Sequence, residues 1–207
     1  MAVIIFDFDG TIADSFNVII DVFEHITKRP EKLTEEQMAE LRGYPLEIVA
    51  ERLHIPWWRL PFLLAKGRRM MGKRMEEIPV FEGMGRVIDR LHAEGHELFV
   101  VSSNSRRNVS KFLKHHHLNK YFVEVRGNAG LLGKARILRR LVRANNFSVG
   151  DCLYIGDETR DIVAAKAVGM RMVAVSWGFA NADFLESMHP TAMAHEPGDI
   201  IKVLEEL

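Results

Sequence analysis

Two aspartates near the start of the chain could bind a metal ion together. The apolar run Val3–Phe6 leads directly into Asp7, Phe8, Asp9 and Gly10. Because side chains alternate along a strand, Asp7 and Asp9 are expected to project to the same side. Paired carboxylates with open coordination positions suit Mg²⁺, which usually takes one or two carboxylates plus substrate phosphate oxygens. The alternative is a simple polar turn in which an aspartate caps the next helix.

Other polar residues follow other apolar runs in the same way. Ser102 and Asp157 each end such a run, Asp161 lies four residues beyond Asp157, and Lys134 opens a helical pattern after a glycine-rich loop. In open α/β sheets, ligands bind at the carboxyl ends of the strands. An acidic cluster with a hydroxyl and an ammonium group indicates phosphoryl transfer, in which positioning and charge neutralisation provide most of the catalysis.

The elements that must position these residues alternate along most of the chain. Short apolar runs are separated by amphipathic helical patterns, which predicts an α/β fold with a parallel sheet flanked by helices and right-handed crossovers. The expected strands after the first are 97–102, 122–125, 152–157, 171–176 and 191–194, and the expected helices are 83–94, 107–117, 134–145, 161–168 and 198–207.

Residues 15–79 differ from this pattern because they contain helical patterns only. Helices are predicted after Ser15, after a capping box at Thr34, at 46–53 and over about 57–77. We expect this segment to be a small helical domain inserted into a core formed by residues 1–14 and 80–207. Its own core is expected to contain the aromatic side chains Trp57, Trp58 and Phe62, together with Leu63. The basic run 68–74 is expected to be solvated, with one member reaching an anionic substrate as the alternative.

The overall composition argues against nucleic-acid-binding and membrane-spanning proteins. Among 207 residues, 28 lysines and arginines balance 28 aspartates and glutamates, so no net charge draws the protein to nucleic acid or an anionic membrane. No apolar run is long enough to span a bilayer, and the first residues lead into a strand instead of a signal sequence. A single cysteine, Cys152, fits a reducing compartment. We expect a cytoplasmic protein, and the oligomeric state stays open.

Four short motifs, taken together, resemble those of a known family. Asp7–Thr11, Ser102, Lys134 and Gly156–Asp161 are similar, in this order, to the four motifs of the haloacid dehalogenase superfamily. The chain most resembles the phosphoglycolate phosphatase and β-phosphoglucomutase branch. This resemblance covers essentially the whole chain and implies a Rossmann-like core, with residues 15–79 as the helical cap domain of that branch.

The resemblance also implies roles for the acidic residues. Asp7 would attack phosphorus and form an aspartyl-phosphate, and Asp9 would act as the acid and base toward the leaving alcohol and the attacking water. Mg²⁺ would be held by the Asp7 carboxylate, the backbone carbonyl of Asp9 and Asp157. Asp161 would either bind the ion directly or orient a group that does.

Phosphate-binding residues are implied in the same way. Ser102 and the backbone amide of Ser103 would bind the transferring phosphoryl group, and Lys134 would offset its charge. The usual lysine-proline pair of this motif is Lys134-Ala135 here, a departure that makes Lys134 the weakest match. A surface lysine is the alternative reading of Lys134, and an ordinary strand-end serine is that of Ser102.

The function implied is a Mg²⁺-dependent phosphatase acting on a small phosphorylated metabolite, phosphoglycolate-like or a sugar phosphate. An acid at Asp9 argues against a dehalogenase, which needs none there. The alternatives are a phosphomutase of the β-phosphoglucomutase type and a catalytically silent binding module on the same fold. Arg42 and Gly43, in a loop between two helices of the cap, are expected to contact the substrate.

Overall fold

The computed structural model describes residues 1–27, 33–34, 36–37, 41, 44, 46–130 and 133–207. Its centre is a six-stranded sheet with the strand order β3-β2-β1-β4-β5-β6, in which every pairing is parallel. The α/β prediction is confirmed. The strands are β1 (Val3–Phe6), β2 (Glu97–Val101), β3 (Phe122–Arg126), β4 (Cys152–Gly156), β5 (Arg171–Val175) and β6 (Ala192–Ala194).

Strand β1 lies inside the sheet between β2 and β4. Phe6, its last residue, pairs with Val100 on β2 and with Ile155 on β4. Because the later strands are added on opposite sides of β1, the crossovers to its two neighbours diverge at its carboxyl end and leave a crevice there. The residues that follow β1 therefore enter the position at which open α/β sheets bind ligands.

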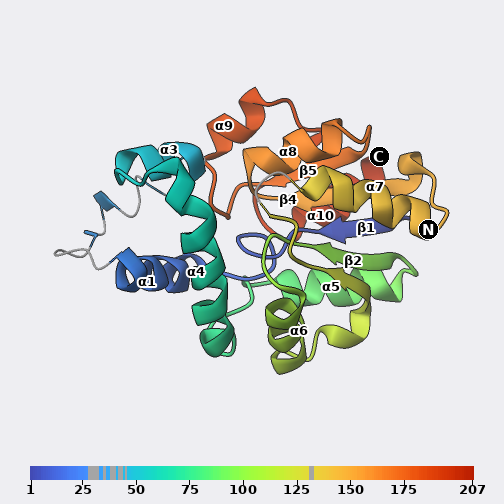
Figure 1. Cartoon of the computed structure of the whole chain (residues 1–207). Helices are drawn as coiled ribbons and strands as arrows, with labels where there is room; N and C mark the ends of the chain where they lie inside the picture. Colours follow the sequence, from blue (N-terminus) through green and yellow to red (C-terminus); the bar gives the residue numbers. More distant parts are fainter. Residues whose placement is uncertain (28–32, 35, 38–40, 42–43, 45, 131–132) are drawn as a thin grey trace.

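Helices cover both faces of the sheet (Figure 1). Ile4 and Phe6 belong to the hydrophobic cluster that includes α5, α6 and α10, whereas Val3 and Ile5 belong to the cluster that includes α7, α8 and α9. This alternation explains why β1 is an unbroken apolar run, since both of its faces are buried. The helices are α5 (Met84–Ala93), α6 (Arg106–His115), α7 (Lys134–Ala144), α8 (Thr159–Lys166), α9 (Ala182–Ser187) and α10 (Asp199–Glu206).

The segment 15–79 contributes helices only, within its described residues. They are α1 (Phe16–Thr27), α3 (Leu46–Arg52), a 3-10 helix (Trp57–Arg59) and α4 (Leu60–Arg74). The predicted capping box is present, because Gln37 N donates to Thr34 Oγ1 at 3.2 Å and Thr34 N donates to Gln37 Oε1 at 3.0 Å. In Figure 1 these helices lie beyond the carboxyl end of β1.

The two connections between this segment and the sheet run side by side. Asp14 N donates to Pro79 O at 3.0 Å, and Phe81 N donates to Ile12 O at 3.1 Å. Ala13 and Val80 form an antiparallel bridge between these bonds. Both ends of the segment are therefore held at one place on the sheet.

The prediction for the aromatic side chains of this segment is wrong. Trp57, Trp58 and Phe62 are 83%, 58% and 74% exposed. The buried cluster consists instead of aliphatic side chains from α1 and the residues after it, whereas the aromatic residues lie in the 3-10 helix and in the first turn of α4. Its buried members are Ile20, Leu33 and Leu41, with Phe16, Val49 and Leu53 packed against them.

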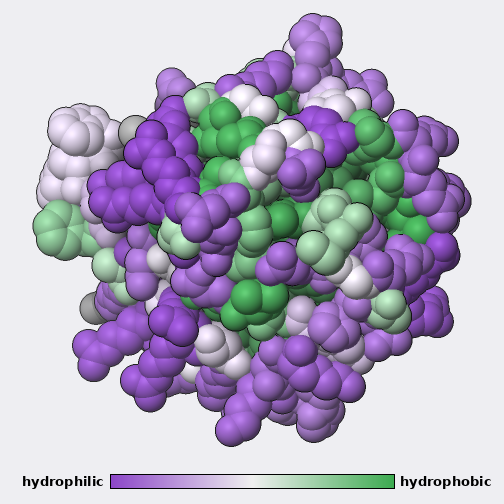
Figure 2. Space-filling view, turned by 90° about the vertical axis from the view of Figure 1, so that its right-hand side faces the viewer, coloured by the Kyte–Doolittle hydropathy of each residue, from purple (hydrophilic) through white to green (hydrophobic). Residues whose placement is uncertain are grey.

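The remaining surface is of mixed polarity. On the face in Figure 2, which lies at the right of Figure 1, hydrophilic side chains dominate the periphery and hydrophobic ones gather toward the middle. In the part of the chain that the structure describes, no helix combines the length and the apolar character needed to cross a bilayer.

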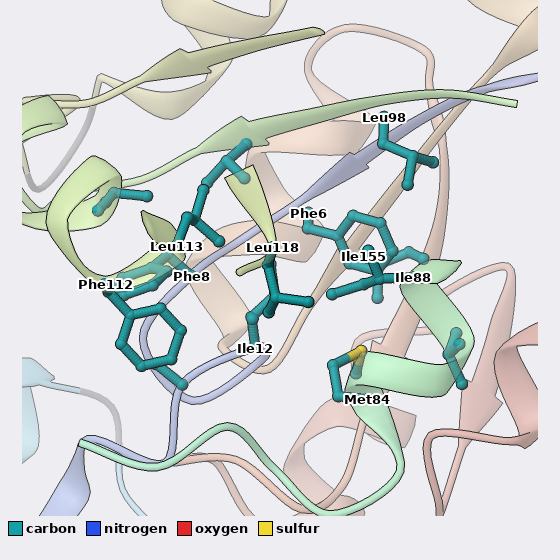
Figure 3. Packing of buried hydrophobic residues seen from close by; sticks show 14 of the residues in the cluster. Phe6, Phe8, Ile12, Met84, Ile88, Leu98, Phe112, Leu113, Leu118 and Ile155 are labelled. Atoms are coloured by element: carbon teal, nitrogen blue, oxygen red, sulfur yellow. The ribbon is translucent and has the colours of Figure 1, made fainter. Parts of the chain in front are cut away.

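Aromatic and aliphatic side chains fill the space between β1, α5 and α6 (Figure 3). Phe8, next to the candidate acids, contacts Phe112 on α6 edge to face, with 4.9 Å between the ring centroids. Both rings are fully buried. The position of the loop after β1 therefore depends on packing beneath it as well as on polar contacts above it.

Phe112→Ala is expected to lower the free energy of unfolding by about 3–5 kcal/mol, because a large buried ring is replaced by a cavity. Urea denaturation followed by circular dichroism measures this change. The exposed Phe62→Ala is the control and is expected to change stability by less than about 0.5 kcal/mol. Equal effects of the two substitutions would contradict the packing described.

Candidate active site

A buried ammonium group connects the acids from two motifs. Lys134, the first residue of α7, lies with its Nζ 2.6 Å from Asp7 Oδ2 and 2.5 Å from Asp161 Oδ1. Asp161 Oδ1 also accepts a hydrogen bond from Tyr154 Oη at 2.9 Å. Lys134 is only 3% exposed and Asp161 is fully buried. Lys134 is thus part of the site, and the alternative of a surface lysine is wrong.

The turn after β4 explains how Asp161 reaches this position. Glu158 caps α8, and its backbone amide donates to Asp161 Oδ2 at 3.1 Å in a capping box. Gly156, the last residue of β4, leaves space for the carboxyl group: a Cβ there would lie 2.7 Å from Asp161 Oδ2. The glycine and the capping box together direct Asp161 back toward the sheet.

Asp157 occupies a narrow slot between two glycines. Its Oδ1 accepts from Thr11 Oγ1 at 2.8 Å and its Oδ2 accepts from Phe179 N at 2.8 Å. A Cβ on either Gly10 or Gly178 would collide with the Asp157 side chain, and Gly10 has a φ of +83°. These contacts bind the first and fourth motifs to each other across the sheet.

Three carboxylates lie close enough to hold a cation. One oxygen from each of Asp7, Glu158 and Asp161 lies within 4.8 Å of the others. A set made only of oxygen donors is the kind that Mg²⁺ prefers. Glu158 had no role in the sequence analysis, and Arg160 forms an ion pair with it. Among the described residues, Asp157 stands outside this trio of carboxylates.

Asp9 is held by a side chain that the sequence analysis did not identify. Asn104 Nδ2 donates to Asp9 Oδ2 at 3.0 Å, and Asn104 N donates to Ser102 Oγ at 2.9 Å. Asn104 is buried. It follows the motif serine by only two residues, and an amide at that position is the signal that could have found it.

Ser102 and Ser103 lie at the end of β2 within the same crevice. Ser102 N donates to Arg126 O at 2.9 Å, and Ser103 Oγ donates to Gly130 O at 3.1 Å. Gly127 allows these loops to approach, because a Cβ there would lie 2.7 Å from Asn104 O. The two serines are therefore fixed by the last residue of β3 and by the loop that follows it.

A hydrogen-bonded chain links Asp9 to helix α4. Asn108 Nδ2 donates to Asn104 Oδ1 at 2.9 Å and also to the backbone carbonyl of Arg68 on α4 at 2.7 Å. The Arg68 guanidinium donates to Ser103 O at 3.0 Å. Gly72 permits this close contact, because a Cβ there would lie 2.7 Å from Asn108 Oδ1.

Burial determines the ionisation of the site. Desolvation raises the pKa of Asp7 to about 7, although Lys134 works in the opposite direction. Burial and the neighbouring Glu158 raise the pKa of Asp157 well above its ordinary value, and burial also raises the pKa of Asp9. The pKa of Lys134 is raised because the charges of Asp161 and Asp7 outweigh its desolvation. Lys134 is therefore a cation, whereas Asp7, Asp9 and Asp157 keep their protons to a higher pH than ordinary aspartates.

Part of the site lines one end of a cavity of about 260 Å³. Asp7, Asp9, Ser102, Ser103 and Lys134 are all at its surface. Its other end is formed by α1, α3 and α4. The cavity thus joins the candidate site to the helical segment.

The expected substrate residues Arg42 and Gly43 lie outside the described residues. Their neighbour Tyr44 lines the cavity. Arg68, from the basic run of α4, also lines it, which agrees with the alternative considered for that run. Two acidic side chains, hydroxyl and amide groups and a buried cation therefore meet at one place.

Known proteins are similar in sequence to this chain along nearly its whole length. The model of the family described as haloacid dehalogenase-like hydrolase matches residues 4–175. A phosphoglycolate phosphatase of Synechococcus elongatus is 31% identical over 211 residues, covering 100% of this chain and 99% of that protein. A pyrophosphatase of Bacillus cereus is 22% identical over 210 residues, covering 99% and 96%.

Solved structures agree on the fold. One titled a predicted phosphatase from Clostridium acetobutylicum superposes with a TM-score of 0.85 at 22% identity, covering 100% of this chain and 99% of the other. A haloacid dehalogenase-like protein from Streptococcus pneumoniae gives a TM-score of 0.81 at 18% identity, covering 99% and 98%. At these identities the likeness shows the fold alone.

The raised acid pKa values predict how stability depends on pH without metal. The native protein keeps the Asp7 proton up to about pH 7, whereas the unfolded chain releases it near its ordinary pKa of 3.8. The free energy of unfolding in EDTA should therefore fall between about pH 4 and pH 7, by up to about 4 kcal/mol. Asp157 and Asp9 act in the same direction.

Urea denaturation across this range in EDTA measures the effect. Asp7→Asn resembles the protonated acid, so its stability should depend less on pH than that of the wild type. Added Mg²⁺ should restore stability at pH 7, because a cation binds the ionised carboxylates. Wild-type stability that rises from pH 4 to pH 7 in EDTA would contradict the ionisation described.

Proposed function

The chain belongs to the haloacid dehalogenase-like hydrolase family and is a phosphatase, and on that premise we propose that it hydrolyses small phosphate monoesters through an aspartyl-phosphate on Asp7. The observation that carries this proposal is the contact of the buried Asp7 carboxylate with the Lys134 ammonium group at one end of a cavity. A carboxylate compensated by a fixed cation can approach an anionic phosphate that would otherwise repel it.

In the first step an Asp7 oxygen attacks phosphorus, and the ester bond to the leaving alcohol breaks. The Asp9 carboxyl group gives its proton to that alcohol. In the second step Asp9 takes a proton from water, the water oxygen attacks phosphorus, and the bond to Asp7 breaks to release phosphate. Burial supports this role, because it raises the pKa of Asp9 and favours the protonated form that the first step requires.

The remaining groups bind and neutralise the phosphoryl oxygens. Ser102, the backbone amide of Ser103 and Lys134 are proposed to contact them, which their common position at the cavity supports. The hydrogen bond from Asn104 fixes the orientation of the Asp9 carboxyl group.

The residues present fit a Mg²⁺ site. The Asp7 carboxylate, the Asp9 backbone carbonyl, Asp157 and Asp161 are proposed to hold the ion, with Glu158 added because its carboxylate lies beside those of Asp7 and Asp161. When bound, Mg²⁺ would supply positive charge that neutralises the phosphate oxygens and orients them for in-line attack. The positive charge of the ion would also offset the desolvation of the buried carboxylates.

The helical segment 15–79 is proposed to act as a cap domain over a core of residues 1–14 and 80–207. Its two adjacent connections at Asp14 and Pro79 support a hinge at one place. The contacts of Arg68 with Ser103 and Asn108 support a closed position over the site. Closure would exclude bulk water from the aspartyl-phosphate.

Asp7→Asn is expected to lower phosphate release by about 10³-fold or more, because the amide cannot serve as the nucleophile. Release from a panel of phosphate monoesters with Mg²⁺ measures this loss. Acid quenching should trap labelled phosphate on the wild type and none on the variant. The exposed Asp183→Asn is the matched control and should behave as the wild type.

Two results would contradict the proposal. Near-normal hydrolysis by Asp7→Asn would exclude Asp7 as the nucleophile. Poor net phosphate release that is activated by a bisphosphorylated sugar would instead identify a phosphomutase.

Glu158→Gln is expected to raise the Mg²⁺ concentration needed for half-maximal activity by about ten- to a hundredfold, because one oxygen donor beside the ion loses its charge. Mg²⁺ titrations of initial rates measure this shift. Glu186→Gln, at an exposed position on α9, is the matched control. An unchanged Mg²⁺ requirement in Glu158→Gln would exclude Glu158 from the metal site.

A further inference from the structure

We infer that the cavity selects phosphate monoesters whose alcohol carries an apolar group, either a short alkyl chain or a single aromatic ring. The inference rests on the proposed phosphatase function and adds the chemical class of the leaving group. It comes from the part of the cavity that the chemistry does not use, namely the wall formed by the helical segment.

This wall is aliphatic and aromatic along three helices. Ile19 and Phe23 come from α1, Val49 comes from α3, Leu53 follows α3 directly, and Leu63 and Leu64 come from α4. All six side chains are partly exposed, so they are not fully packed against one another. Their uncovered apolar surface would gain about 25 cal/mol for each Å² that an apolar ligand buries.

Charge is concentrated at the opposite end of the cavity. Of the described residues of the helical segment that line it, Arg68 alone is charged, and its guanidinium already donates to Ser103 O at 3.0 Å. Arg160, from the core, is paired with Glu158. A charged group on the far side of the substrate would therefore face an apolar wall, where it would lose its hydration without a partner.

The size of the cavity limits the length of that apolar group. A volume of about 260 Å³ is near the lower end of the range of roughly 300–1,000 Å³ typical of small-molecule sites. Part of this space belongs to the phosphate at the acidic end. The remainder fits a few methylene groups or one ring.

A series of linear alkyl phosphates tests the inference on the unmodified protein. Ethyl, butyl and hexyl phosphate have the same ester chemistry and differ only in methylene groups. Each methylene buried in the cavity should raise kcat/KM about fourfold, mainly through KM, so that hexyl phosphate, with four more methylenes, exceeds ethyl phosphate by roughly 250-fold. Phosphoglycolate, in which a carboxylate replaces the methyl group of ethyl phosphate, should fall below butyl phosphate.

A pair of substitutions on the same helix locates the effect. Leu64→Gln places an amide in the apolar wall and should lower the ratio of hexyl to ethyl phosphate kcat/KM by about tenfold. Phe62→Gln is the matched control, because Phe62 is 74% exposed and lies outside the lining of the cavity. It should leave the ratio unchanged, and circular dichroism shows whether each variant is folded.

The outcomes separate this inference from the function on which it rests. Equal rates for the alkyl series, with ethyl phosphate hydrolysed, would overturn the inference and leave the phosphatase proposal intact. Phosphoglycolate as a better substrate than hexyl phosphate would overturn it in the same way and would point to Arg68 as a carboxylate ligand. No hydrolysis of any ester with Mg²⁺ present would overturn both.

Discussion

The Lys134 ammonium group lies between the carboxylates of Asp7 and Asp161, and three separate parts of the chain meet at this contact. Bringing acids into a region from which water is excluded has a large desolvation penalty, which only a well-placed cation offsets. The end of β1, the start of α7 and the first turn of α8 are therefore positioned by the same ion pairs. The remainder of the site, including Asp9 and the serines after β2, is arranged around them.

Much of this arrangement follows from local sequence. Apolar runs ending in Asp7, Ser102 and Asp157 predicted strands that the structure contains. Because all pairings are parallel, the polar residues that follow these strands lie together at the carboxyl end of the sheet. Strand order is not a local property, since it depends on which crossovers pack together. That Asp7 and Lys134 would touch across 127 residues rested on the resemblance to a family and not on the spacing of residues.

The features that were missed depend on tertiary contacts. Asn104 hydrogen bonds to Asp9 across 95 residues, so no helix or strand period could connect them. The sequence around Glu158 is typical of a solvated helix start. In the structure, the capping box directs Asp161 inward, and the Glu158 carboxylate lies beside it. Hydrophobicity alone placed Trp57 in a core, whereas the structure places it in the 3-10 helix before α4, where it is exposed. The hydrophobicity of a side chain favours its burial, but the tertiary structure determines whether the side chain is buried.

The paired connections at Ile12–Asp14 and Pro79–Phe81 have a consequence for how such proteins diversify. Because the chain leaves the sheet and returns to it at hydrogen-bonded neighbours, a loop of almost any length can be carried there without separating the strands. The sheet retains its acids and its lysine while the inserted helices change in sequence, size or number. Under the roles proposed here, selection for new substrates can act on the inserted helices and leave the reacting groups of the sheet undisturbed.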